Sequence, residues 1–323
     1  MTSLRCGINT WRVAVFAAGL MAVSVCAQTY PSKTIRIVTG PAASGSDIVA
    51  RLLAPGLSAS LGQPVVVENR AGIIAVESSA KAPPDGHTLL VYGSVVWMEP
   101  LLRANAPWDP VRDFAPITLA ARSPNILVVH PSLPVKTVKD LIALAKSKPG
   151  ELRYASAGSG TTAQLAAELF KSMAGKLDIV HVPYKGLTPA LIDLMSGRVH
   201  LSFAVAASVV SQTKSGKMKA LAVTSAKRAT LLPVVPTLDE SGLRGYELVS
   251  WYGVSAPTGV SNEIITRLNA AIGKVVNVPA MKDWLIKQGF EPQTNTPAQF
   301  AAFIGREIAQ GAELVKATGL KVE

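Results

Sequence analysis

Cysteine is nearly absent from this chain of 323 residues, and its two cysteines, Cys6 and Cys26, lie close to the amino terminus. An apolar run from Val13 to Val25 leads into Cys26 and Ala27, and two arginines precede it, a pattern typical of a secretory signal peptide. We expect cleavage near Ala27, with residues 1–27 removed and no thiol left. This excludes disulfides, cysteine nucleophiles and cysteine-based metal sites in the mature chain. Lipidation of Cys26 is a weaker alternative, because a valine precedes it.

Long hydrophobic runs are also lacking. The run that precedes Ala27 is about half of the ~20 residues that a membrane-spanning helix needs, and no later stretch of the sequence is long and apolar enough. We therefore expect a secreted protein that is soluble after cleavage. The remaining ~296 residues should divide into two domains, each with its own hydrophobic core.

Acidic residues are few relative to basic ones, 21 against 32, which gives the full chain a net charge of +11. Loss of Arg5 and Arg12 with the signal peptide leaves about +9, a surplus that favours acidic ligands through long-range attraction. The basic residues occur singly and aromatic residues make up only 6% of the chain. A nucleic-acid partner is therefore not expected.

Residues for catalysis or metal binding are scarce too. The sequence contains no Gly-x-Ser-x-Gly elbow and no P-loop lysine motif, and no two histidines have the i, i+4 spacing of a helical zinc pair. We expect no metal and no cofactor, and a structural role for all four histidines, His87, His130, His181 and His200. An acid/base pair formed only in space stays open as an alternative.

What the sequence does contain is an alternation of short apolar runs with helical patterns. From Ile35 to Val91 and again from Val138 to Thr224 this alternation predicts βαβ units, hence an α/β fold with two mostly parallel sheets. Two long apolar stretches, 116–129 and 246–256, break the pattern and are expected to pass between the lobes. Helices expected at 261–276, 279–288 and 297–316 should return to the first lobe. The predicted lobes are residues 28–123 with 251–323, and residues 124–250.

A loop of small residues joins a strand to a helix once in each lobe. The first loop runs from Gly40 to Ser46 and the second from Ala157 to Thr161. A loop of this kind offers unpaired backbone N–H groups and the positive end of a helix dipole, which favour a carboxylate or phosphate. Two such loops predict a clamp for a small anion with more than one carboxylate.

The second loop also satisfies the Gly/Ala form of the dinucleotide fingerprint, from Gly158 to Ala163. Asp178 has the spacing of the required acid, but it opens the next strand instead of ending it. We therefore favour simple anion binding over dinucleotide binding or a structural turn.

Two charged residues beside the loops have open roles. Asp47 either complements the dipole of the helix that it opens or reaches into the cleft toward a ligand hydroxyl or amine. Lys185 follows a strand end on the expected rim of the cleft, where it either contacts an anion or is simply solvated.

Several segments in order resemble the Bug-type periplasmic solute-binding receptors of tripartite tricarboxylate transporters. The resemblance extends from Tyr30 nearly to the carboxyl terminus. It is carried by Tyr30–Arg36, Val67–Arg70, Ala82–Leu90, Asp113–Ile117, Tyr154–Thr161, His181–Gly186, Leu221–Ser225 and Val235–Gly242.

The resemblance implies a two-lobed periplasmic-binding-protein fold of type II, a Venus flytrap with a ligand cleft between the lobes. It also implies a receptor in the periplasm without catalytic activity, and an inner-membrane permease as partner. We expect the protein to be a monomer. The expected ligand contacts are Ala42, Ala43, Ser44, Gly45, Ser46, Asp47, Tyr92, Ser94, Ser156, Gly158, Ser159, Gly160, Thr161, Thr162, Lys185, Gly186 and Thr188.

The chain departs from the family pattern at three places near the expected cleft. Ala43 to Ser46 replaces a Gly-Gly pair, Ala71 to Ile74 replaces a glycine-rich segment, and Ala204 follows Phe203 where an aspartate is usual. These changes favour a ligand with an apolar middle, such as a long aliphatic or an aromatic dicarboxylate. A secreted hydrolase or lyase, and the soluble input of a carboxylate-sensing system, remain alternatives.

Overall fold

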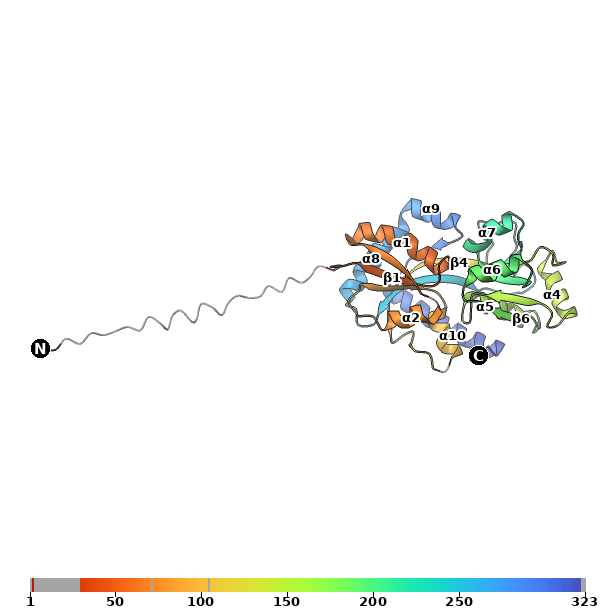
Figure 1. The fold of residues 1–323 in the computed structure, drawn as a ribbon, viewed down its shortest axis with the longest axis horizontal. Helices are drawn as coiled ribbons and strands as arrows, with labels where there is room; N and C mark the ends of the chain where they lie inside the picture. Colours follow the sequence, from red (N-terminus) through yellow and green to blue (C-terminus); the bar gives the residue numbers. More distant parts are fainter. Residues whose placement is uncertain (1, 3–29, 71, 104, 321–323) are drawn as a thin grey trace.

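The computed structural model describes residue 2 and residues 30–70, 72–103 and 105–320. The expected signal peptide and its cleavage site near Ala27 lie outside these residues, apart from residue 2. The described chain forms two α/β halves joined by long strands, with α1, α2, α8 and α9 in one half and α4, α5, α6 and α7 in the other (Figure 1). Across the described residues, no helix has the length and apolar character needed to cross a membrane.

The first half contains three parallel strands, in the order β2, β1, β3, with helices in the connections. Alternate residues of β1 face opposite sides: Ile35 and Ile37 pack with α1 and α8, whereas Val38 packs with α2. The bounds are β1 (Ile35–Thr39), α1 (Gly45–Leu61), β2 (Val65–Asn69), α2 (Gly72–Ala80), β3 (Thr88–Tyr92) and α3 (Val95–Leu102).

Two long strands cross between the halves. Strand β4 (Phe114–Val129) pairs antiparallel with β9 (Val249–Pro257) through Pro124, and from Asn125 onward it pairs with strands of the second half. Strand β9 in turn pairs with β3. The expectation that these two stretches are extended and pass between the lobes is confirmed.

The second half repeats the architecture of the first, with parallel pairs between β5 and β6 and between β5 and β7. Helices cover both faces of its sheet: Tyr154 and Phe203 pack with α4 and α5, and Ala155 and Ala204 pack with α6 and α7. The bounds are α4 (Val138–Ser147), β5 (Arg153–Ser156), α5 (Thr162–Met173), β6 (Val180–Pro183), α6 (Leu187–Met195), β7 (Leu201–Val205), α7 (Ala206–Lys214) and β8 (Lys219–Val223).

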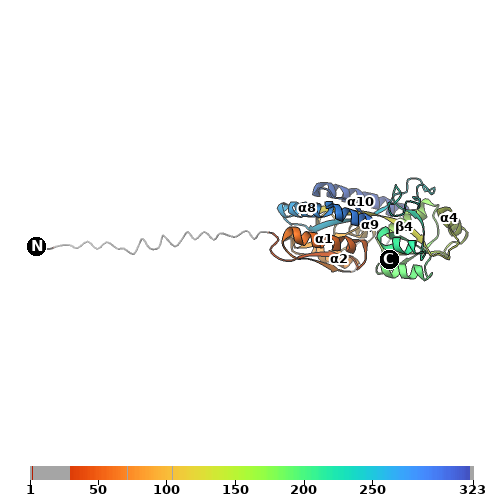
Figure 2. The same ribbon diagram turned by 90° about the horizontal axis from the view of Figure 1, so that it is seen from above.

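The C-terminal elements return to the first half, as expected, and lie beside it in both views (Figure 1, Figure 2). Helix α8 (Asn262–Asn277) packs on α1, and α9 (Pro279–Lys287) leads to the short β10 (Glu291–Pro292), which pairs with β4. Helix α10 (Pro297–Thr318) differs from the expectation, because it contacts α3 of the first half and also α5 of the second.

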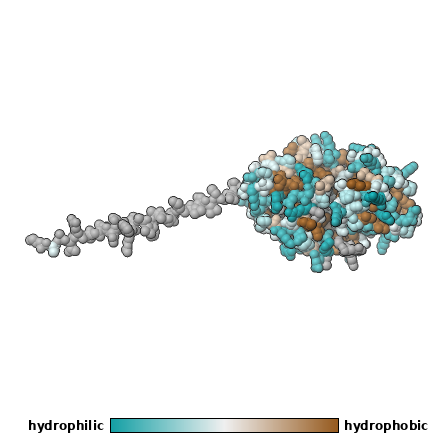
Figure 3. Space-filling model, viewed as in Figure 1, coloured by the Kyte–Doolittle hydropathy of each residue, from teal (hydrophilic) through white to brown (hydrophobic). Residues whose placement is uncertain are grey.

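Local sequence signals account for where the helices begin and end. The Ser44 hydroxyl accepts from Asp47 N at the start of α1, and Gly62 ends the helix with φ +74°. Thr296 and Gln299 form a capping box at the start of α10. Hydrophilic residues cover most of the face drawn in Figure 3, with hydrophobic residues in small separate patches, as expected when the apolar positions fill the cores.

Candidate ligand-binding site

A cavity of about 690 Å³ lies between the two halves, within the size range of small-molecule sites. Ser44 of the first loop and Ser159 of the second both line it, so the two loops face a shared space. Apolar and aromatic side chains provide much of the remaining wall: Pro41, Ile73, Ile74, Val95, Leu187, Phe203, Val205, Tyr92, Tyr184 and Tyr252.

Helices of both halves begin at the wall of this cavity. The sequence pointed to the starts of α1 and α5, and the structure adds those of α2, α3, α6 and α7, at Gly72, Val95, Leu187 and Val205. No capping side-chain hydrogen bond forms at the start of α3, α5, α6 or α7. Because the first N–H groups of a helix have no partner within it, the cavity is well provided with donors and positive dipole ends.

The first loop is held by Asp47. Its carboxylate is 3% exposed, accepts from Ala43 N at 2.9 Å and from Asn69 Nδ2 at 2.7 Å, and pairs with Arg51. Asn69 Nδ2 also donates to Gly40 O at 2.8 Å. Asp47 does not line the cavity, so the structure favours the structural interpretation of this residue.

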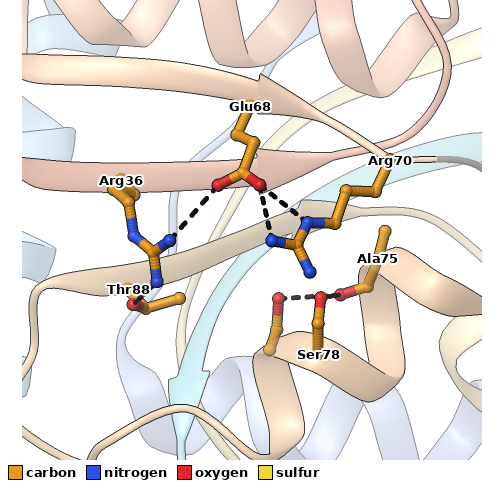
Figure 4. Close-up of polar contacts among 7 residues, drawn as sticks. Arg36, Glu68, Arg70, Ala75, Ser78 and Thr88 are labelled. Carbon is orange, nitrogen blue, oxygen red and sulfur yellow. Dashed lines mark hydrogen bonds and ion pairs between the residues drawn. The ribbon is translucent and has the colours of Figure 1, made fainter.

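The segment that carries Asn69 is itself anchored by a charged cluster at Glu68. The Glu68 carboxylate lies between Arg36 and Arg70, and Arg36 also reaches Thr88 (Figure 4). These contacts connect β1, β2 and β3. Helix α2, drawn beside this cluster in Figure 4, has a hydrogen bond of its own, in which Ser78 Oγ donates to Ala75 O at 3.2 Å.

The second loop is held by hydrogen bonds of its own. Ser156 Oγ accepts from Gly158 N at 3.2 Å and lies 2.7 Å from His181 Nε2. Gln164 Oε1 accepts from Gly160 N at 2.8 Å, and Thr161 Oγ1 donates to Gly158 O at 2.7 Å. Gly158 and Gly160 have φ of +122° and +71°, conformations that suit glycine.

His181 should therefore make stability depend on pH. Burial lowers its pKa from 6.5 to about 4. An unfolded chain then binds more protons than the folded protein between these pH values, so stability should be complete above about pH 6.5 and fall as the pH decreases toward 4. With partial exposure allowed for, we expect a loss on the order of 1 kcal/mol.

Urea denaturation between pH 7 and pH 4 measures this loss. His181→Gln should reduce the slope of the unfolding free energy against pH. The matched control is His130→Gln, because His130 forms its hydrogen bond with Ser132 near the surface. An unchanged slope in His181→Gln would contradict the assignment.

The two halves touch directly beside the cavity. Ser94 Oγ donates to Gly160 O at 3.1 Å and lies 3.2 Å from Thr162 Oγ1. Pro41 and Gly186 approach each other as well, since a Cβ on Gly186 would lie 3.6 Å from Pro41 Cβ. Each loop thus contacts the opposite lobe beside the cavity, the second loop through Ser94 and the first loop through Gly186.

The structure brings most of the sequence-predicted residues to the cavity wall. Those that line it are Ser44, Gly45, Ser46, Tyr92, Ser94, Gly158, Ser159, Thr161, Thr162, Lys185 and Gly186. The others support the loops from behind or lie beside them: Ala42, Ala43, Asp47, Ser156, Gly160 and Thr188.

Several lining residues were not predicted from the sequence, above all Glu99 of α3 and the oppositely charged Arg103 directly after this helix. Glu99 is 3% exposed, and its Oε1 lies 3.0 Å from Arg103 Nε. Burial raises the pKa of the Glu99 carboxyl, an effect that Arg103 opposes. A lone acid within the apolar run Val95–Leu102 was the one signal that could have identified it.

The cavity wall lacks the residues that the sequence analysis considered for catalysis, dinucleotide binding or metal binding. None of the four histidines, all of which are described, lines it, and neither does Asp178. Within the described ranges, no cluster of histidine and acidic side chains could hold a metal ion.

A sheet in two halves, crossing strands and a cavity with helix starts from both sides define a two-lobed periplasmic-binding-protein fold of type II. Comparison with known proteins identifies the family. Residues 49–320 match the model of the tripartite tricarboxylate transporter family receptor, and the chain belongs to this family.

Similar proteins agree with the assignment. The protein BugT of Bordetella pertussis is 37% identical over 318 residues, which cover 96% of each chain. An R. palustris protein solved with adipate is 37% identical, with a TM-score of 0.87 over 90% of this chain and 99% of that one. MatC from Rhodopseudomonas palustris, solved with bound malate, is 29% identical, with a TM-score of 0.83 over 88% of this chain and all of the other (100%).

Proposed function

We propose that this protein is a periplasmic receptor that captures a small carboxylate between its lobes and delivers it to a tripartite tricarboxylate-type permease. The observation that carries the proposal is the meeting at one cavity of helix starts without a side-chain cap from both lobes, α3 from the first lobe and α5 and α6 from the second. A ligand that contacts both lobes binds the closed form better and so shifts the population toward it.

The ligand that we propose is a dicarboxylate with an apolar middle. Ile73 and Ile74 line the cavity, which favours methylene or aromatic groups between the charged ends. Ala204 gives no such support, because it is fully buried against α6 and α7 and does not line the cavity. The adipate held by the similar R. palustris protein has the proposed character.

The proposal also covers the signal peptide, the oligomeric state and the bounds of the lobes. We propose that residues 1–27 are a signal peptide removed near Ala27, and that the protein acts as a monomer without catalytic activity. The proposed lobes are residues 28–123 with 251–323, and residues 124–250, supported by the change of strand partners within β4 at Asn125.

Calorimetric titration tests the ligand class. We expect a micromolar Kd for adipate or terephthalate, which corresponds to about 8 kcal/mol, and binding of citrate at least ten times weaker. Quantitative recovery of the unchanged ligand separates a receptor from a hydrolase or lyase. Tight citrate binding, with neither adipate nor terephthalate bound, would refute the apolar-middle ligand.

A further inference from the structure

Glu99 places a buried negative charge at the wall of a cavity otherwise suited to anions. It belongs to α3 of the first lobe, and its Oε2 would lie 3.4 Å from a Cβ on Gly160 of the second lobe. Its carboxylate therefore adjoins the second loop, where the start of α5 offers N–H groups to the ligand.

The charge of Glu99 is only partly offset by its partner. Arg103 also lines the cavity, but its side chain is 43% exposed, against 4% for Glu99. Solvent screens the exposed guanidinium more than the buried carboxylate. Solvent therefore screens the positive charge of this pair more than the negative charge, and the negative charge lies buried at the cavity wall.

The other titratable groups around Glu99 do not remove this charge. Tyr92, at the end of β3, is neutral near pH 7, since burial raises its pKa to about 12. Lys185 of the second lobe is exposed, so solvent screens its charge. On α10, which packs against α3, the charged residues Arg306, Glu307 and Glu313 line a neighbouring cavity and not this one, although Ser94 and Thr162 line both.

We propose that Glu99 makes this end of the cavity a hydrogen-bond-accepting subsite, which selects a ligand end that donates a hydrogen bond over a second bare carboxylate. Hydroxyl, amide, ammonium or protonated carboxyl groups meet this need. Two carboxylates side by side cannot both stay ionised in a buried site, so a dicarboxylate shares one proton with Glu99 when it binds. The inference rests on the proposed function and narrows its ligand class to one anionic and one donating end.

The test compares adipate with its monoamide, which has a donating amide in place of one carboxylate. Titration at pH 7 in two buffers of different ionisation enthalpy counts the protons taken up on binding. For the unaltered protein we expect about one proton with adipate and none with the monoamide. This measurement needs no variant, so it remains decisive even if a variant fails to fold.

Substitution gives an independent test. Glu99→Gln should abolish proton uptake and raise the affinity for adipate relative to the monoamide at least tenfold. The matched control is Glu151→Gln, which removes one member of the exposed Lys148–Glu151 pair away from the cavity and should change neither quantity.

Adipate binding without proton uptake, and with the same ligand ratio in Glu99→Gln, would overturn the subsite while leaving the receptor function intact. Failure of the unaltered protein to bind any carboxylate would overturn both.

Discussion

Replacing Gly253 with alanine is expected to lower the free energy of unfolding by about 3 kcal/mol, at the upper end of the usual cost of overpacking. Gly253 lies in β9, where a Cβ would overlap Phe300 Cζ and lie 2.9 Å from both Phe300 Cε atoms. Phe300 is 1% exposed and packs edge-to-face against Trp251, so its ring has little room to move. Urea denaturation followed by tryptophan fluorescence measures the loss.

Two further variants isolate the clash as the cause. Gly305→Ala, on an open position of α10, should leave stability unchanged or slightly higher, since nothing lies within 4 Å of the added Cβ. Phe300→Leu should rescue Gly253→Ala, because it removes the overlapping end of the ring. Equal stability of Gly253→Ala and Gly305→Ala would show that the packing between β9 and α10 is looser than described.

The strands and helices of the two lobes could be predicted because each has a local signal. Strand β3, for example, is an apolar run, Thr88–Tyr92, that directly follows a Pro-Pro-Asp-Gly turn. Helices α8 and α10 begin close to the expected residues 261 and 297, each after a hydroxyl residue, Ser261 and Thr296, that accepts the capping hydrogen bond. Such signals lie within a few residues of the element that they define.

Helices α3 and α7 were not predicted, and α3 shows why. Seven of its eight residues are apolar, Pro100 interrupts it, and it packs between α2 and α10, so no polar face gives a helical period. Because α3 was not predicted, Glu99 and Arg103 were not predicted as cavity-lining residues either, since it is this helix that places them at the cavity wall. Contacts that depend on packing between distant segments leave no local signal.

The role of Asp47 was undecidable from sequence for a similar reason. Its position in the first turn of α1 fits both a structural and a ligand-binding carboxylate. The choice depends on Asn69, 22 positions away, whose amide donates to Asp47 Oδ1. Only the fold shows that this carboxylate holds the first loop and does not line the cavity.

If the start of α5 holds a ligand carboxyl group, a further negative charge beside it, in addition to Glu99, should weaken binding strongly. Ser159 lines the cavity in the loop before α5, and Ser159→Asp is expected to weaken adipate binding at least 100-fold, about 2.7 kcal/mol. The substitution should not destabilise the fold, because a carboxylate near a helix start interacts favourably with the dipole. Calorimetry and thermal unfolding measure the two effects.

Ser159→Asn is the matched control, because it has nearly the same shape and no charge. We expect it to weaken binding less than tenfold, so that the difference between the two variants reports charge and not bulk. High salt should narrow that difference only slightly, since a partly buried charge is poorly screened. Adipate affinities within threefold of each other in Ser159→Asp and Ser159→Asn would mean that the start of α5 does not hold the adipate carboxyl group that shares a proton with Glu99, and the proposed mode of capture would have to be abandoned.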